Sequence, residues 1–229
     1  MRPWDYWLTL GGRDLRYKGI LFDLDGTLLD TNELIIKSFQ HTIAVHYKRE
    51  VDIDIVRAFF GKTARAALEF LGPDKVEEMT KTFREYQNIH HDQFAKIFAG
   101  VAEVIQELYN ASVLLGIVTS KKYDTAMRGL KLFDMDKYFS VVIGADQCQN
   151  TKPHPEPVQL ALNKLGLAPQ DCLMVGDSPF DILSGRKAGV KTAAVRWSEV
   201  SWPDVMAAEP DYIIDTMVEL ISLGEINTK

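Results

Sequence analysis

The sequence predicts an α/β fold, in which a doubly wound parallel sheet carries an all-helical module inserted after its first strand. A short apolar strand at 20–22 is followed by helical periodicity, without strand signals, from 33 to 96. From residue 100 onward, apolar runs alternate with helical segments at lengths that suit right-handed strand–helix–strand units. Polar residues follow several of these strands, at the edge where such sheets bind ligands.

Length and composition restrict the class of protein. The chain has 229 residues, which suits one large domain or a core with an inserted module. It is 46% hydrophobic and 25% charged, and no apolar run approaches the roughly 18 residues that a membrane helix needs. A net charge of -6 argues against the sequence-independent attraction that dominates nucleic-acid binding. We therefore expect no membrane and no nucleic acid as partner. The sequence leaves the oligomeric state, monomer or homodimer, open.

The predicted elements divide the chain into three parts. We expect an N-terminal extension at 1–18, an α/β core domain at 19–32 and 97–229, and a helical cap domain at 33–96. In the cap, helices are predicted at 31–43, 52–60, 63–71 and 74–94 from apolar residues at helical spacing. In the core, strands are predicted at 20–22, 113–118, 140–144, 172–175, 192–196 and 212–215, with helices at 101–109, 124–132, 155–165 and 182–188.

The two cysteines indicate the compartment. Cys148 and Cys172 lie in different predicted elements, and no second pair is present that could complete a zinc-type cluster. We therefore expect two free thiols and a cytoplasmic protein.

Two acidic residues close the first predicted strand. Side chains two apart on a strand share a face, so Asp23 and Asp25 leave its carboxyl end on the same side. Gly26 lets the backbone turn sharply after them. Aligned carboxylates repel one another unless a cation, a proton or hydrogen bonds compensate, and Mg²⁺ prefers oxygen ligands together with substrate phosphate. The pair therefore indicates a Mg²⁺ site, although aspartates before a glycine also begin solvated turns.

Polar residues also follow the second and the fourth predicted strands. Thr119 and Ser120 end the second, and Asp177 and Asp181 follow the fourth, while Lys152 lies in a proline-rich loop before a helix. Each has an ordinary structural alternative, namely a helix N-cap, a surface lysine or an aspartate at a helix start. Their convergence with the first strand on one edge of the sheet favours a catalytic site.

Four ordered motifs carry a resemblance to a known family. They are Asp-x-Asp-Gly-Thr at 23–27, Thr-Ser at 119–120, Lys-Pro-x-Pro at 152–155 and Gly-Asp-x-x-x-Asp at 176–181. In this order they resemble the haloacid dehalogenase (HAD) superfamily, which implies a HAD-like, Rossmannoid core. The helical module is similar to that of the branch with phosphoglycolate phosphatases and β-phosphoglucomutase. Stretches at 30–36, 152–157 and 189–195 resemble the PpaX-type inorganic pyrophosphatases.

The resemblance implies an aspartyl-phosphate mechanism. Asp23 would attack phosphorus, and Asp25 would act as acid and base and supply a backbone carbonyl to the metal. Asp177 would be the third protein ligand of Mg²⁺, the cofactor that the resemblance implies. Asp181 would orient Lys152 or a water at the metal rather than bind the metal directly.

The resemblance also implies groups that bind the substrate. Thr119 through its hydroxyl and Ser120 through its backbone N–H would hold phosphoryl oxygens. Lys152 would neutralise the remaining charge. Gly26 and Thr27 would shape the turn that leads toward the cap.

The cap residues that face the site are harder to derive. We expect 59–65 to be the substrate loop, because Lys62 or Arg65 could bind a second phosphate or a carboxylate, although a solvated helix start is an equally good interpretation. In this loop Lys62 directly follows Gly61. The resembled pyrophosphatases usually carry Pro-Ser after this glycine, whereas this chain has Lys62 and Thr63. The substrate therefore stays open at this point.

We expect a Mg²⁺-dependent phosphohydrolase that acts on a small anionic phosphate compound, with inorganic pyrophosphate as first choice and 2-phosphoglycolate as second. A dehalogenase is disfavoured because it would not keep an acid and base at Asp25. A β-phosphoglucomutase-like phosphomutase shares both aspartates and differs mainly in the cap. A catalytically silent binding protein could keep the fold, but intact Asp23, Lys152 and Asp177 argue against it.

Overall fold

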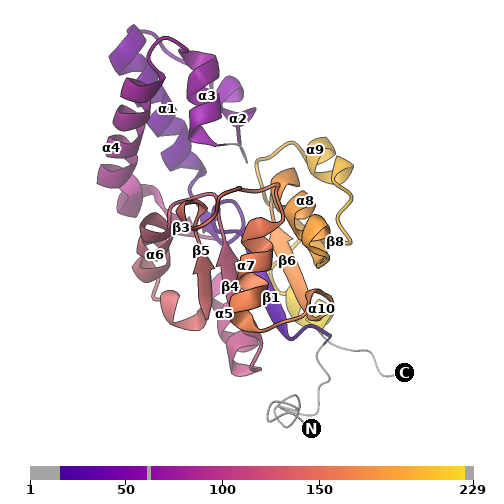
Figure 1. Cartoon of the computed structure of the whole chain (residues 1–229). Coiled ribbons are helices and arrows are strands. Elements are labelled where there is room, and N and C mark those ends of the chain that lie inside the picture. Colours follow the sequence, from indigo (N-terminus) through magenta and orange to yellow (C-terminus); the bar gives the residue numbers. More distant parts are fainter. Residues whose placement is uncertain (1–15, 61–62, 225–229) are drawn as a thin grey trace.

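The computed structural model describes residues 16–60 and 63–224. An α/β core occupies the lower part of Figure 1, and a bundle of helices lies above it. Most of the predicted extension at 1–18 and the predicted substrate residue Lys62 lie outside the described residues. Within the described ranges, no helix combines the length and the apolar character needed to cross a membrane.

Six parallel strands form the central sheet, in the order β5-β4-β1-β6-β7-β8. The chain moves outward from β1 to β5 on one side and from β6 to β8 on the other, so the winding reverses beside β1. This arrangement confirms the predicted doubly wound sheet. The strands are β1 (Gly19–Phe22), β4 (Leu114–Val118), β5 (Val141–Ile143), β6 (Cys172–Gly176), β7 (Lys191–Val195) and β8 (Tyr212–Ile214).

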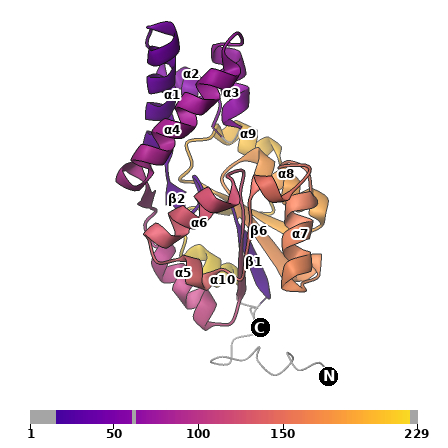
Figure 2. The ribbon, with the colours of Figure 1, turned by 60° about the vertical axis from the view of Figure 1, so that its left-hand side comes forward.

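Apolar side chains on both faces of β1 hold the layers of the core together. Ile20 and Phe22 belong to the apolar cluster under α5, α6 and α10, whereas Leu21 belongs to the opposite cluster under α7. All three are fully buried, as expected for a strand covered on both faces. Figure 2 shows the two helix layers on either side of the strands. These helices are α5 (Val101–Asn110), α6 (Tyr123–Leu132), α7 (Glu156–Leu165), α8 (Pro179–Ala188) and α10 (Glu219–Gly224).

The helices between β1 and β4 pack around an apolar core of their own. The rings of Phe39 and Phe83 pack at a tilt with their centroids 4.6 Å apart, and both are buried together with Leu68 and Met79. The predicted all-helical cap is therefore present, whereas its limits at 33 and 96 stay predictions. Its helices are α1 (Asn32–Tyr47), α2 (Ile53–Arg57), α3 (Ala64–Leu71) and α4 (Val76–Phe94).

Two short strands lie where the chain leaves and re-enters the core. β2 (Leu29–Asp30) pairs antiparallel with β3 (Lys96–Ile97). Neither was predicted, because two residues are too few for the alternation that marks a strand. The helices α9 (Trp202–Ala207) and α10 were not predicted either, because six residues are too few to show a clear helical periodicity. The ribbon of β2 and β3 brings both chain crossings to one edge of the cap.

The starts of two helices differ from the predictions in a way that affects the site. α8 begins at Pro179, earlier than predicted, because Ser178 and Asp181 bond reciprocally in a capping box. α1 begins at Asn32, one residue later than predicted, and the hydroxyl of Thr31, the residue before it, does not cap the helix. It donates instead to the carboxylate of Asp25.

Candidate active site

The carboxyl ends of β1, β4 and β6 line a cavity that the cap covers. The cavity has a volume of about 160 Å³, which is below the roughly 300 Å³ at which pockets for drug-sized ligands begin. The site therefore suits a small substrate. The predicted residues that line it are Asp23, Asp25, Gly26, Thr119, Ser120, Lys152 and Asp177.

A buried lysine holds the first aspartate. Lys152 Nζ lies 2.7 Å from Asp23 Oδ1, 2.5 Å from Asp181 Oδ1 and 3.0 Å from the carbonyl oxygen of Val118. These three acceptors match the three N–H bonds of an ammonium group. Within the described part of the chain, Asp23 Oδ2 has no hydrogen-bond partner. This second oxygen is therefore available for chemistry.

The buried carboxylates outnumber the lysine. Burial raises the pKa of Asp23 to about 7, because the attraction of Lys152 does not offset burial together with repulsion from Asp181. Burial, and then repulsion from Asp181 and Asp23, raises the pKa of Asp177 well above its usual range. Burial opposes the charged form of Lys152, but the two carboxylates raise its pKa above the ordinary value. The cluster therefore favours an additional positive charge.

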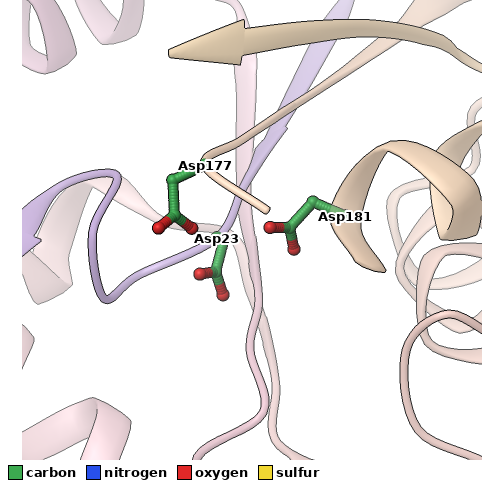
Figure 3. A group of neighbouring side chains, drawn as sticks. All are labelled: Asp23, Asp177 and Asp181. Atoms are coloured by element: carbon green, nitrogen blue, oxygen red, sulfur yellow. The ribbon is translucent and has the colours of Figure 1, made fainter. Parts of the chain in front are cut away.

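Carboxylate oxygens of Asp23, Asp177 and Asp181 lie within 4.8 Å of one another. Figure 3 shows the three side chains gathered in one place. Oxygen donors of this kind fit Mg²⁺. Asp181 is the least available donor, because Oδ1 accepts from Lys152 while Oδ2 accepts from the backbone N–H and the hydroxyl of Ser178. Asp181 thus combines the two interpretations open at the sequence level, a capping aspartate and a partner of the lysine. Asp23 and Asp177 are better placed to bind a metal.

Gly26 brings the turn after β1 against Asp177. Its φ of +79° lies in the left-handed region that favours glycine, and a Cβ atom at this position would collide with the Asp177 carboxylate. Thr27, the next residue, is fully buried and is not among the cavity-lining residues. Its carbonyl oxygen accepts from Trp197 Nε1 at 3.2 Å. The structure therefore gives Thr27 a place in the turn rather than on the cavity wall.

Asp25 has different surroundings from Asp23. Its side chain is 20% exposed, and Oδ1 accepts from the Thr31 hydroxyl at 2.6 Å and lies 2.8 Å from Lys121 Nζ. The two aspartates of the first motif thus have separate partners, which suits separate roles. Sequence reasoning missed both contacts. The position of Lys121, directly after the Thr-Ser pair at a strand end, was the available signal.

Thr119 and Ser120 lie where β4 ends. Thr119 is buried, and its hydroxyl oxygen accepts from the backbone N–H of Lys121 at 3.2 Å, while Ser120 is exposed. Neither residue caps α6, because Lys122 occupies the N-cap position. The alternative interpretation of this pair as an N-cap is therefore wrong.

The cap side of the cavity carries no charged side chain among the residues that the structure describes. Arg65 is not in the lining, because its guanidinium pairs with Glu69 at 3.0 Å and with Glu77 at 2.7 Å. The structure therefore does not bring Arg65 to the site. The predicted substrate loop at 59–65 does line the cavity, but through Phe59, Phe60, Thr63 and Ala64 rather than through Arg65. Sequence reasoning missed the lining residues of α1 and α4, because apolar residues at helical spacing are also typical of a helix core. The cap residues in the lining are Asn32, Ile35, Phe39, Phe59, Phe60, Thr63, Ala64, Phe83 and Gln87.

The loop after β7 contacts both Asp177 and the cap. The Ser198 hydroxyl donates to Asp177 Oδ2 at 2.8 Å. Next to it, Glu199 accepts from Arg57 Nε of α2, also at 2.8 Å. This loop was not among the predicted site segments, because nothing in its sequence indicates a site.

Comparisons with known proteins extend over nearly the whole chain. A family model described as "Haloacid dehalogenase-like hydrolase" matches residues 20–195. The pyrophosphatase PpaX of Anoxybacillus flavithermus is 42% identical over 210 residues, which cover 92% of this chain and 98% of the relative. The pyrophosphatase PpaX of Halalkalibacterium halodurans is 41% identical over 210 residues, with the same coverage.

Solved structures share the fold. A hydrolase described as a haloacid dehalogenase-like family protein from Streptococcus pneumoniae matches with a TM-score of 0.83 and 27% identity, over 90% of this chain and 98% of that one. A structure described as a predicted phosphoglycolate phosphatase from Haemophilus somnus matches with a TM-score of 0.85 and 23% identity, over 91% and 98% of the two chains. At that identity the second match shows the fold alone.

Proposed function

Since the chain belongs to the haloacid dehalogenase-like hydrolase family and is a phosphatase, we propose that it hydrolyses inorganic pyrophosphate with Mg²⁺ through an aspartyl-phosphate intermediate. The observation that carries the proposal is the convergence of Asp23, Lys152 and Asp177 on one small cavity. The relatives named pyrophosphatase, at 42% and 41% identity, support the choice of substrate.

Asp23 supplies the nucleophile. Because Lys152 holds Oδ1 at 2.7 Å, Oδ2 attacks phosphorus while the bond from phosphorus to the leaving oxygen breaks on the opposite side. Thr119 through its hydroxyl and Ser120 through its backbone N–H donate to the equatorial phosphoryl oxygens. The product of this step is a phosphorylated Asp23 and a released phosphate.

Asp25 moves the protons. It protonates the leaving oxygen in the first step, and in the second step it takes a proton from the water whose oxygen attacks phosphorus. The bond from phosphorus to Asp23 then breaks, which regenerates the carboxylate and releases the second phosphate. The separate partners of Asp25, namely Thr31 and Lys121, support a role different from that of Asp23.

The side chains of Asp23 and Asp177, with the backbone carbonyl of Asp25, would hold Mg²⁺. When bound, the ion supplies positive charge between the carboxylate nucleophile and the phosphate. The chain contributes a buried donor set whose repulsion the metal relieves, and the Ser198 hydroxyl orients Asp177.

We also propose that the protein acts in the cytoplasm. Both cysteines, Cys148 and Cys172, are free thiols in the structure. Reduced cysteines of this kind are typical of a reducing compartment.

Phosphate release from a panel of substrates tests the proposal. The panel contains pyrophosphate, 2-phosphoglycolate, hexose phosphates and nucleotides, each with Mg²⁺ and with EDTA. We expect the highest kcat/KM for pyrophosphate, and no turnover in EDTA. Asp23→Asn should lower turnover by more than roughly 10⁴-fold, because the amide is not a nucleophile here. Asp204→Asn, at an exposed position in α9, is the matched control.

The same panel separates the alternatives. Steady-state hydrolysis by the Asp23→Asn variant would contradict the mechanism. A higher kcat/KM for 2-phosphoglycolate would replace the substrate and keep the phosphatase mechanism. Isomerised sugar phosphate without stoichiometric phosphate would indicate a phosphomutase, and no release from any compound would indicate a binding protein.

A further inference from the structure

We propose that Lys121 selects substrates whose leaving group carries a negative charge. The inference rests on the proposed aspartyl-phosphate mechanism, and it concerns the part of the substrate that departs rather than the phosphoryl group that is transferred. The leaving group of pyrophosphate is phosphate, and that of 2-phosphoglycolate is glycolate. Both leaving groups are anions. A cation in the cavity would stabilise this half of the substrate.

The backbone of Lys121 is fixed on both sides. Its N–H donates to Thr119 Oγ1 at 3.2 Å, and its carbonyl oxygen accepts from the N–H of Ala145 at 2.8 Å. The side chain lines the cavity and is 16% exposed. The ammonium group is therefore held at the cavity rather than in bulk solvent.

Two cations line the cavity in the part of the chain that the structure describes, namely Lys121 and Lys152. Lys152 uses its three N–H bonds on acceptors of the core and lies beside the nucleophile. The Lys121 ammonium contacts one acceptor among the described residues, Asp25 Oδ1 at 2.8 Å. An ammonium has three N–H bonds, so two remain for a ligand.

The contact with Asp25 places Lys121 next to the departing group. A general acid must lie within hydrogen-bond reach of the oxygen that it protonates. Because Lys121 Nζ lies 2.8 Å from Asp25 Oδ1, a leaving oxygen within hydrogen-bond reach of the Asp25 carboxyl group lies near this ammonium.

The cap side of the cavity strengthens the preference for an anionic leaving group. It includes the apolar side chains of Phe60 and Phe83, and the described cap residues in the lining carry no charge. Attraction between opposite charges is stronger in a weakly polar site than in water. Among the described residues, an anionic leaving group therefore finds its counter-charge at Lys121.

A matched pair of substrates tests the inference. Ethyl phosphate carries a methyl group where 2-phosphoglycolate carries its carboxylate, so the two differ in the charge of the leaving group. In Lys121→Met we expect kcat/KM for 2-phosphoglycolate and for pyrophosphate to fall at least tenfold more than kcat/KM for ethyl phosphate. Lys121→Arg should restore the ratio. Lys122→Met, which removes the same charge at an exposed neighbouring residue, should leave the ratio unchanged.

A binding measurement gives a readout without turnover. In the Asp23→Asn background, Lys121→Met should raise the Kd of pyrophosphate with Mg²⁺ at least fivefold by calorimetry. An equal Kd, or an equal loss of kcat/KM for all three substrates, would overturn the inference and leave Lys121 as a positioning residue for Asp25. If the wild type prefers 2-phosphoglycolate to pyrophosphate, the proposed substrate fails while the ratio to ethyl phosphate still tests Lys121.

Discussion

The core side and the cap side of the cavity are built in different ways. On the core side, Asp23 and Lys152 are buried and bonded to groups at the ends of the parallel strands. On the cap side, the described lining is apolar or uncharged, and an ion pair between Arg57 and Glu199, both partly exposed, joins cap to core. Buried bonds therefore hold the core side in place, whereas weaker, partly exposed contacts join the cap to it.

A second contact between cap and core has the same character. Arg128 of α6 donates to Asp92 Oδ1 at 3.0 Å and to the carbonyl oxygen of Asn88 at 2.8 Å, both on α4. Exposed ion pairs each contribute about 0–1 kcal/mol. We therefore expect substitutions on the core side to change stability and metal binding more than substitutions on the cap side change activity.

The largest effect on stability should come from removing the buried ammonium. Lys152→Met leaves the carboxylates of Asp23 and Asp181 buried without their cation, so the free energy of unfolding should fall by about 3–5 kcal/mol in EDTA at pH 8. Urea denaturation measures it. Lys164→Met, at an exposed position of α7, is the control. Equal losses in the two variants would refute the special role of the buried lysine.

A smaller loss should follow when one hydrogen bond of the metal site is removed. Ser198→Ala takes away the donor to Asp177 Oδ2, and loss of such a partner typically weakens metal binding by about 10–100-fold. Calorimetric titration with Mg²⁺ measures the affinity. Ser198→Thr keeps the hydroxyl and should bind nearly as the wild type does. Unchanged affinity in Ser198→Ala would show that this bond does not orient the carboxylate.

The metal-free protein should lose stability as the pH rises. Because the pKa of Asp23 is about 7 in the folded state, against an ordinary value of 3.8, the folded state binds more protons between these values than the unfolded state does. The free energy of unfolding should therefore fall by up to roughly 1.4 kcal/mol per pH unit for this group. The raised pKa of Asp177 acts in the same direction.

Denaturation in EDTA from pH 5 to pH 8 checks this dependence. Asp23→Asn removes the titrating group and should give a flatter profile. A free energy of unfolding that increases over this range in the wild type would contradict the prediction.

The smallest effect should come from the cap. Arg57→Glu or Glu199→Arg alone should change kcat/KM by no more than about fivefold, because this ion pair is partly exposed. The double variant restores opposite charges and should return toward the wild-type value. A change of a hundredfold from either single variant would mean that this contact determines activity as strongly as the core side does.

Much of the core could be predicted from the sequence. Asp23 and Asp25 follow a fully apolar run, so their place at a strand end followed from the pattern alone, and the parallel sheet brought Thr119 and Asp177 to the same edge. The comparisons confirm the resemblance that the four motifs indicated. Strand ends are predictable because the apolar run and the turn after it are both local signals.

The cap side could not be predicted in the same way. Phe39 and Phe83 pack against each other in the cap core and also line the cavity. Their spacing in the sequence indicates the packing but not the contact with the cavity. Arg65 was a candidate for binding an anion, but it pairs with Glu69 and Glu77 instead. The local sequence pattern does not show the second pair, because Glu77 lies on another helix. The pairing of Lys121 with Asp25 depends on two strand ends meeting, which a linear motif does not record.

The ribbon of β2 and β3 has a further consequence for proton transfer. It gathers both crossings of the chain in one pair of strands, and Thr31 is the first residue after β2. The Thr31 hydroxyl grips Asp25 at 2.6 Å. The residue that joins this ribbon to α1 is therefore bonded directly to Asp25, so the start of the first cap helix and the Asp25 carboxylate are held in place together.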